Sequence, residues 1–360
     1  MENAVLALNA IRPGMFTAEP VLDNNKQIIL QQDIELTSHM INLLQKWKIN
    51  SVCVRPAQTE TDFKSSGNPR SPNQSAYPFD FSERYHRAAT LAGNVFEYMR
   101  SNEQLPYDTF HQLAHHGLYE LTCEKAVLAN LYRLKPSTDY TYLHAVDVGI
   151  IAGLIGRWCG FEERTVQSLI LAGVMHDIGK SQIPRSILDK PSKPSDEQMD
   201  ILKLHPVYGY YMVKSISDIS SEIEYAILQH HERMNGGGYP AGIHAHRIHP
   251  FAKIISIADV YDALTSNRVY KKSITPFAAL DILVDQIFTH FDHKYCKLFI
   301  QSALKPLIGS TVLLSDQSQA KVLYFSYFMS AKPVVQKEDG SILDLNQPHS
   351  ASIVEVVKFS

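Results

Sequence analysis

Apolar residues recur every three to four positions along the middle of the chain, which is the period of a helix that buries one face. Residues 82–135 have this period, and Pro106 is expected to divide them into two helices. It continues over residues 136–305, and the most apolar stretch, residues 146–158, predicts a buried core helix. The pattern therefore predicts a mainly α fold.

Two helix starts within this region carry a polar signal. Ser195 with Gln198, and Ser221 with Glu224, have the spacing of capping boxes, in which two polar side chains bond to the first turn of a helix. We therefore expect one helix to begin at each serine.

The two ends of the chain have other patterns. Residues 1–55 alternate short apolar runs with turn residues, and they predict a helix over 37–47 followed by a strand over 51–54. Beyond residue 308 the apolar period becomes two, as in strands, and Asp339-Gly340 is a hairpin signal. A small α+β module is therefore expected at the N-terminus and a β-rich module at the C-terminus.

These patterns divide the chain into five segments. We expect a small α+β module over residues 1–55, a linker over 56–80, a helical segment over 81–135, a helical domain over 136–307 and a β-rich module over 308–360. The linker is inferred from its many Pro, Ser, Asn and Gly residues. The helices of residues 82–133 would either join two copies in a homodimer or pack onto their own domain.

Composition narrows the function classes. Of the 360 residues 45% are apolar and 20% are charged, as in ordinary globular proteins, and the formal net charge of -3 gives no basic field for DNA or an anionic membrane. The four cysteines form no CxxC pair, which favours reduced thiols and a cytoplasmic protein. We also expect no signal peptide and no membrane insertion, because neither pattern is present.

Histidines and aspartates interrupt the apolar helices of residues 136–305. Each alone is more often a hydrogen-bonded core residue than a ligand, but together they would bury five imidazoles and two carboxylates, each needing its own partner. One metal cluster satisfies all of them. The candidate ligands are His144, His176, Asp177, His205, His230, His231 and Asp259.

The donor set and its spacing indicate a chemistry. Imidazole and carboxylate without thiolate suit iron, manganese, zinc, cobalt or nickel, and argue against magnesium or calcium. His176 and Asp177 are adjacent and project about 100° apart on a helix, so the carboxylate can bridge two neighbouring ions. Two such ions can share a bridging hydroxide and hold both the attacked phosphate and its leaving oxygen. Lys180 could then stand near that phosphate.

A glycine-rich loop follows the last two histidines. Gly237, Gly238, Tyr239 and Pro240 lie directly after candidate ligands, so we interpret them as a substrate loop rather than as a flexible turn. Tyr239 could stack on a guanine or pack beneath the loop. Arg268 forms a short basic patch with Lys271, which could bind the substrate or be a solvated face.

Five motifs together resemble a known family. They are the segment from Asp139 to His144, HDIGK (176–180), LHPVYG (204–209), HHERMNGGGYPAG (230–242) and ADVYDALTSNRVYKK (258–272). Over roughly residues 138–305 the chain resembles the HD-GYP family of bacterial cyclic di-GMP phosphodiesterases, which belongs to the HD hydrolase superfamily.

The resemblance implies a helical HD-type metal-dependent hydrolase domain over residues 136–307, with the seven candidate ligands holding two iron or manganese ions. It implies catalytic roles for Asp177 and Lys180, contact of Lys180 with the scissile phosphate, and binding of the cyclic dinucleotide by the loop, Arg268 and Lys271. The implied reaction is hydrolysis of cyclic di-GMP to pGpG through a metal-bridging hydroxide, with GMP as a further product left open. Tyr140 stands where some members carry a Glu for a third metal, which argues for two metals here.

Two other functions are kept as alternatives. One is a non-catalytic signalling module that binds cyclic di-GMP, for which degenerate ligands would be the sign. The other is an HD-type phosphohydrolase or di-iron oxygenase with another substrate. The intact ligand set argues against the first, and the loop with its two basic residues argues against the second.

Overall fold

The computed structural model divides into two compact units. One comprises residues 1–78 and 304–360, and the other comprises residues 79–303. The structure describes residues 4–13, 15–22, 28–30, 36, 41, 44–45, 49–55, 81–102, 105–134, 140–188, 190, 192–217, 219–267, 272–325 and 330–360, and of residues 28–30, 100–102, 140 and 141 only the backbone.

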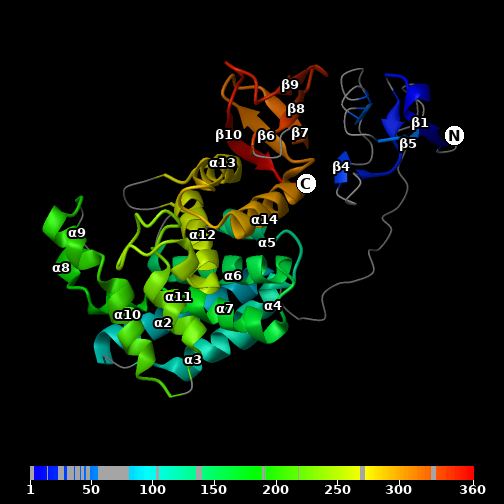
Figure 1. The fold of residues 1–360 in the computed structure, drawn as a ribbon. Coiled ribbons are helices and arrows are strands. Elements are labelled where there is room, and N and C mark those ends of the chain that lie inside the picture. Colours follow the sequence, from blue (N-terminus) through cyan, green and yellow to red (C-terminus); the bar gives the residue numbers. More distant parts are fainter. Residues whose placement is uncertain are drawn as a thin grey trace. The chain divides into compact units, whose positions relative to one another are not determined.

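The unit of residues 79–303 is built from helices, as the period of three to four predicts (Figure 1). Its α-helices are α2 (Phe81–Asn102), α3 (Tyr107–Gln112), α4 (Tyr119–Thr122), α5 (Val127–Leu134), α6 (Tyr140–Trp158), α7 (Glu163–Met175), α8 (Arg185–Leu188), α9 (Asp196–Leu202), α10 (His205–Lys214), α11 (Ser221–Gln229), α12 (Pro250–Thr265), α13 (Pro276–Gln286) and α14 (His293–Leu304). A π-helical turn η2 (Leu113–Leu118) and the 3-10 turns η3 (Ile178–Gln182) and η4 (Ala245–Arg247) complete it.

Helix α6 lies at the centre of this unit and packs against both α7 and α12. Its Ile150 and Ile155 are 0% exposed, so the predicted core helix is confirmed. Two glycines let α6 and α7 approach closely, because a methyl group on Gly173 would lie only 2.8 Å from the Cα atom of Gly149. This approach brings the start of α6 to the end of α7, where candidate ligands lie on both helices.

The predicted helix boundaries are largely confirmed. Pro106 separates α2 from α3, and Ser195 and Gln198 form the expected capping box at the start of α9. The capping box expected at Ser221 is wrong. Ser220 caps α11 instead, since its backbone is extended (ψ 133) and its hydroxyl accepts from the N–H of Glu222 at 3.3 Å, which leaves Ser221 as the first helical residue.

The other unit contains antiparallel sheets with the strand orders β1-β5-β2, β3-β4 and β10-β6-β7-β8-β9. Its strands are β1 (Ala4–Ala7), β2 (Phe16–Thr17), β3 (Val21–Leu22), β4 (Ile28–Leu30), β5 (Ser51–Arg55), β6 (Thr311–Leu314), β7 (Gln319–Tyr324), β8 (Val334–Lys337), β9 (Ile342–Asp344) and β10 (Ile353–Lys358), with 3-10 turns η1 (Leu8–Ala10) and η5 (Lys305–Leu307). The predicted hairpin at Asp339-Gly340 is confirmed between β8 and β9.

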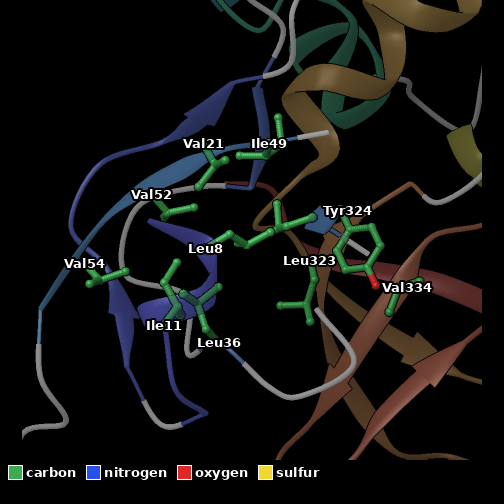
Figure 2. Packing of buried hydrophobic residues seen from close by; sticks show 11 residues of the cluster. Leu8, Ile11, Val21, Leu36, Ile49, Val52, Val54, Leu323, Tyr324 and Val334 are labelled. Atoms are coloured by element: carbon green, nitrogen blue, oxygen red, sulfur yellow. The ribbon is translucent and has the colours of Figure 1, made fainter. Parts of the chain in front are cut away.

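Residues from both ends of the chain form one core in this unit. Leu8 and Val52 from the N-terminal segment pack in one buried cluster with Leu323, Tyr324 and Val334 from the C-terminal sheet (Figure 2). The strands of each segment therefore bury their apolar faces against the other segment.

Two predictions fall on residues that the structure leaves out. The helix expected over residues 37–47 lies largely outside the described residues, and the linker over 56–80 lies wholly outside them. Among the helices of the described ranges, none combines the length and apolar character needed to cross a membrane.

Candidate metal centre

The structure brings the seven predicted ligands together in the helical unit. They form two adjacent groups, each with ligand atoms within 4.8 Å of one another. One group is Asp177, His205, His230 and His231, and the other is His144, His176 and Asp259. They come from α6, the end of α7, the start of α10, the end of α11 and α12.

Asp177 lies between the two groups and turns one carboxylate oxygen toward each. Its Oδ1 is 3.1 Å from Nε2 of His205, and its Oδ2 is 3.2 Å from Nε2 of His176. This is the arrangement expected of a carboxylate that bridges two ions.

Three imidazoles are oriented by the helix to which each is attached. The Nδ1 atoms of His176, His205 and His230 lie 2.6, 2.7 and 2.7 Å from the carbonyl oxygens three residues earlier. Because a carbonyl oxygen can only accept, Nδ1 carries the proton in each ring. The lone pair of Nε2 then faces the site, as a metal ligand requires.

His144 is held by a carboxylate instead. Its Nδ1 lies 2.7 Å from Oδ2 of Asp262, which is fully buried and also accepts from the hydroxyl of Ser266 at 2.9 Å. A carboxylate behind a ligating imidazole fixes its orientation and makes it a better donor. The prediction of site residues left Asp262 out, although its place one turn after Asp259 on an apolar helix was a signal.

Burial and neighbouring charges keep most of these groups in the protonation state that a metal needs. Burial lowers the pKa of His230 well below its usual value and that of His231 to about 3, so both rings stay neutral. Burial raises the pKa of Asp177, but His176 and Lys180 outweigh this and hold it well below its ordinary value. His144 differs, because hydrogen bonds to Asp259 and Asp262 outweigh burial and raise its pKa to about 9.

Two buried atoms test whether the residues fit a metal. Nε2 of His176 and Oδ1 of Asp177 are buried, and neither makes a hydrogen bond of acceptable geometry with the described residues, despite the short distances around them. Leaving a buried polar atom without a partner is costly. A divalent cation between the two groups would satisfy both atoms, so the residues fit a metal centre.

Lys180 follows His176 by four residues, which would place it one turn further along if the helix continued, but the structure places it differently. Helix α7 ends at Met175, and the chain continues into the 3-10 turn η3, so Lys180 is not one helical turn beyond His176. Its Nζ nevertheless donates to Oδ2 of Asp177 at 2.5 Å. The ammonium therefore lies beside the bridging carboxylate, where a phosphate oxygen could reach it.

The loop after His231 is held by a buried carboxylate. Glu232 is 2% exposed and accepts from the N–H groups of Ala241, Gly242 and Ile243 at 2.8 to 3.1 Å. The ring of Tyr239 stacks on His231 with 4.6 Å between ring centroids. Glu232 follows two candidate ligands in the sequence, but we predicted no role for it. Its role in holding the loop is visible only in the folded structure.

Gly238 is required by a close approach rather than by flexibility. A Cβ atom there would lie 2.4 Å from the backbone nitrogen of Arg233 and 2.5 Å from the carbonyl oxygen of His231, both of which are rigid. We expect Gly238→Ala to lower the free energy of unfolding by about 1–3 kcal/mol, because backbone must move. Thermal unfolding of the purified variant measures this as a lower Tm.

Gly237→Ala is the matched control for this prediction. The nearest atoms to the added Cβ would belong to the side chain of Asn235, at 3.2 Å and beyond, and no backbone atom is as near, so the Tm of this variant should stay close to that of the wild type. Equal Tm values for the wild type and the Gly238→Ala variant would show that the loop has room at this position.

The remaining predicted site residues have different outcomes. Pro240 follows Tyr239 at the exposed edge of the loop. Arg268 and Lys271 lie outside the described residues, so their predicted contact with substrate stays a prediction. His205, His231, Lys180 and Tyr239 all line one cavity of about 680 Å³, which gives the centre access to a ligand.

The residues of this site lie within a region that matches a known family. The HD domain family model matches residues 126–295. The chain is 34% identical over 196 residues to the cyclic di-GMP phosphodiesterase PA4108 of Pseudomonas aeruginosa, which covers 54% of this chain and 47% of that protein. It is 30% identical over 171 residues to the 3'3'-cGAMP-specific phosphodiesterase 1 of Vibrio cholerae, which covers 48% of this chain and 39% of that protein.

A solved structure has the same fold. Bd1817, an HDG"Y"P protein from Bdellovibrio bacteriovorus, matches with a TM-score of 0.53 and 16% identity, over 84% of this chain and 99% of that chain. The chain spans about half or less of the length of the two phosphodiesterases above. The resemblance expected from the motifs is confirmed as a similarity: residues 126–295 match the HD domain family model, and the chain is similar in sequence to a bacterial cyclic di-GMP phosphodiesterase.

Proposed function

We propose that this chain is a metal-dependent phosphodiesterase that hydrolyses cyclic di-GMP to linear pGpG. The observation that carries the proposal is the pair of ligand groups joined by Asp177, with Lys180 and a cavity beside them. The name of the relative PA4108 supports the same substrate. Two ions, iron or manganese, would complete the site.

The residues of the chain have separate tasks in this reaction. Bound divalent ions supply a nucleophile at neutral pH and polarise the attacked phosphate. Asp177 lies between the group of His205, His230 and His231 and the group that contains His176. It would thereby fix the distance between the two ligand groups. The ammonium of Lys180 can neutralise charge that develops on a phosphate oxygen.

A second cyclic dinucleotide is a specific alternative substrate. One relative is named for 3'3'-cGAMP, which has an adenine in place of one guanine. The two substrates share their phosphodiester ring, so the ligand groups and Lys180 cannot distinguish them. Discrimination would fall to the parts of the cavity that meet the bases.

The proposal is tested by a turnover assay. Protein purified without oxygen and loaded with iron or manganese should release pGpG from cyclic di-GMP, measured by liquid chromatography with mass spectrometry. A panel of 3'3'-cGAMP, pGpG and GTP separates the alternatives and tests whether GMP is formed. Tight binding of cyclic di-GMP without any product would instead identify a signalling module, and failure to cleave any cyclic dinucleotide would reject the proposal.

Two further expectations belong to the same proposal. The cytoplasm fits a protein in which Cys53, Cys123, Cys159 and Cys296 are all free. A homodimer through residues 82–133 would have to use surface that is left when α2 packs on α6. Light scattering of the purified protein measures its oligomeric state.

A further inference from the structure

The cavity beside the candidate metal centre has two walls of different character. The inner wall contains Lys180, His205, His231 and Tyr239. An outer wall is provided by α8, α9 and the chain around them, and it includes Ile187, Leu188, Lys190, Lys193, Met199 and Lys203. None of these outer residues was a candidate for function in the sequence.

The three lysines of the outer wall differ in what they bind. Lys190 donates to Oε1 of Gln198 at 2.8 Å, and the same oxygen accepts from the N–H of Ser195 in the capping box of α9. Lys203 lies 3.7 Å from Asp200. Lys193 is exposed and makes no hydrogen bond or ion pair with any described residue. Lys193 is therefore the cation of this wall that is available to a ligand.

Apolar side chains lie beside these cations. Leu188 is half-buried, and Met199 remains 37% exposed although it is apolar. Flat apolar ligands such as nucleobases bind against such surfaces, and methionine adapts its shape to them. The wall therefore combines a positive charge with an apolar surface, which suits a nucleotide.

We propose that the outer wall binds the half of a cyclic dinucleotide that is not being cleaved, with Lys193 paired to its phosphate. This inference rests on the proposed function. A cyclic dinucleotide carries two phosphodiester charges. When one phosphate lies at the inner wall beside Lys180, the other lies elsewhere in the cavity. There an ion pair with a lysine offsets the cost of removing water from the phosphate. A small diester with one phosphate would need only the inner wall.

The test compares two substrates in Lys193 variants of the full chain. Metal-loaded Lys193→Gln and Lys193→Glu are assayed with cyclic di-GMP and with bis(p-nitrophenyl) phosphate, a small diester. For Lys193→Gln, we expect KM for cyclic di-GMP to rise about tenfold with little change in kcat, because one charge-assisted hydrogen bond is lost. Lys193→Glu should raise it further, and Lys193→Arg should restore most of the affinity.

The ratio of kcat/KM for cyclic di-GMP to that for the small diester is the deciding quantity. It should fall about tenfold in Lys193→Gln and stay at the wild-type value in Lys125→Gln, an exposed lysine away from the cavity. A wild-type ratio in both Lys193→Gln and Lys193→Glu would overturn the inference. If the wild type cleaves the small diester but no cyclic dinucleotide, the proposed function itself fails, and this outcome is distinct.

Discussion

Replacing Asp177 with asparagine is expected to lower kcat for cyclic di-GMP by about a thousandfold or more. The change keeps the shape of the side chain but removes the charge that joins the two ligand groups. An amide offers one good oxygen ligand rather than two. It therefore cannot bridge an ion held beside His205 and an ion held beside His176. Metal content, measured by mass spectrometry on the purified protein, should fall together with activity.

The matched control for this prediction is Asp285→Asn. It makes the same chemical change on the exposed surface of α13 and should leave kcat and metal content at their wild-type values. Circular dichroism confirms that both variants fold. If Asp177→Asn kept more than a tenth of the wild-type kcat, Asp177 would not be the bridge between the two groups.

The helical unit could be anticipated because its signals are local. The period of three to four residues gives α6 and α7 directly, and polar ligands stand out against their apolar faces. The convergence of seven residues from α6 to α12 could be inferred because buried imidazoles and carboxylates need a common partner. The orientation of each imidazole ring could not be inferred from the sequence, since it depends on which carbonyl oxygen accepts from its Nδ1 after folding.

Residues that act through other residues were missed for physical reasons. Glu232 holds its loop through three backbone N–H groups, and a side chain that binds backbone has no signature in the sequence. The position of Asp262 one turn after Asp259 was a signal of a role at the site, but this spacing does not distinguish an aspartate that holds a ligand from a ligand itself. Lys193, which we propose to contact the substrate directly, gave no signal for another reason: it lies in a segment rich in proline and serine, which is also the composition of an ordinary surface loop.

The shared core of the two chain ends was also beyond sequence reasoning. The strand that contains Val52 and the strand that contains Leu323 were each predicted from their own pattern, but no strand was expected near Leu8. Leu8 and Leu323 lie in one buried cluster although more than three hundred residues separate them in the sequence. Periodicity carries no information about which distant apolar faces pack together. Distant apolar faces find each other only in the folded chain.

Removing metal is expected to abolish activity completely and reversibly. The donor set of five imidazoles and two carboxylates prefers transition metals over magnesium or calcium, because imidazole is a poor ligand for those hard cations. After treatment with a chelator and removal of the chelator, iron(II) or manganese(II) without oxygen should restore turnover of cyclic di-GMP. Magnesium and calcium should not restore it at the same concentration.

Thermal unfolding gives this prediction a second readout that does not depend on turnover. The buried Nε2 of His176 and Oδ1 of Asp177 make no hydrogen bond of acceptable geometry with the described residues, so a bound cation should stabilise the folded state. Adding manganese(II) at a hundredfold excess over its Kd should increase the free energy of unfolding by about 2.7 kcal/mol. A Tm that is the same with and without metal, together with full activity after chelation, would mean that the two ligand groups do not hold ions.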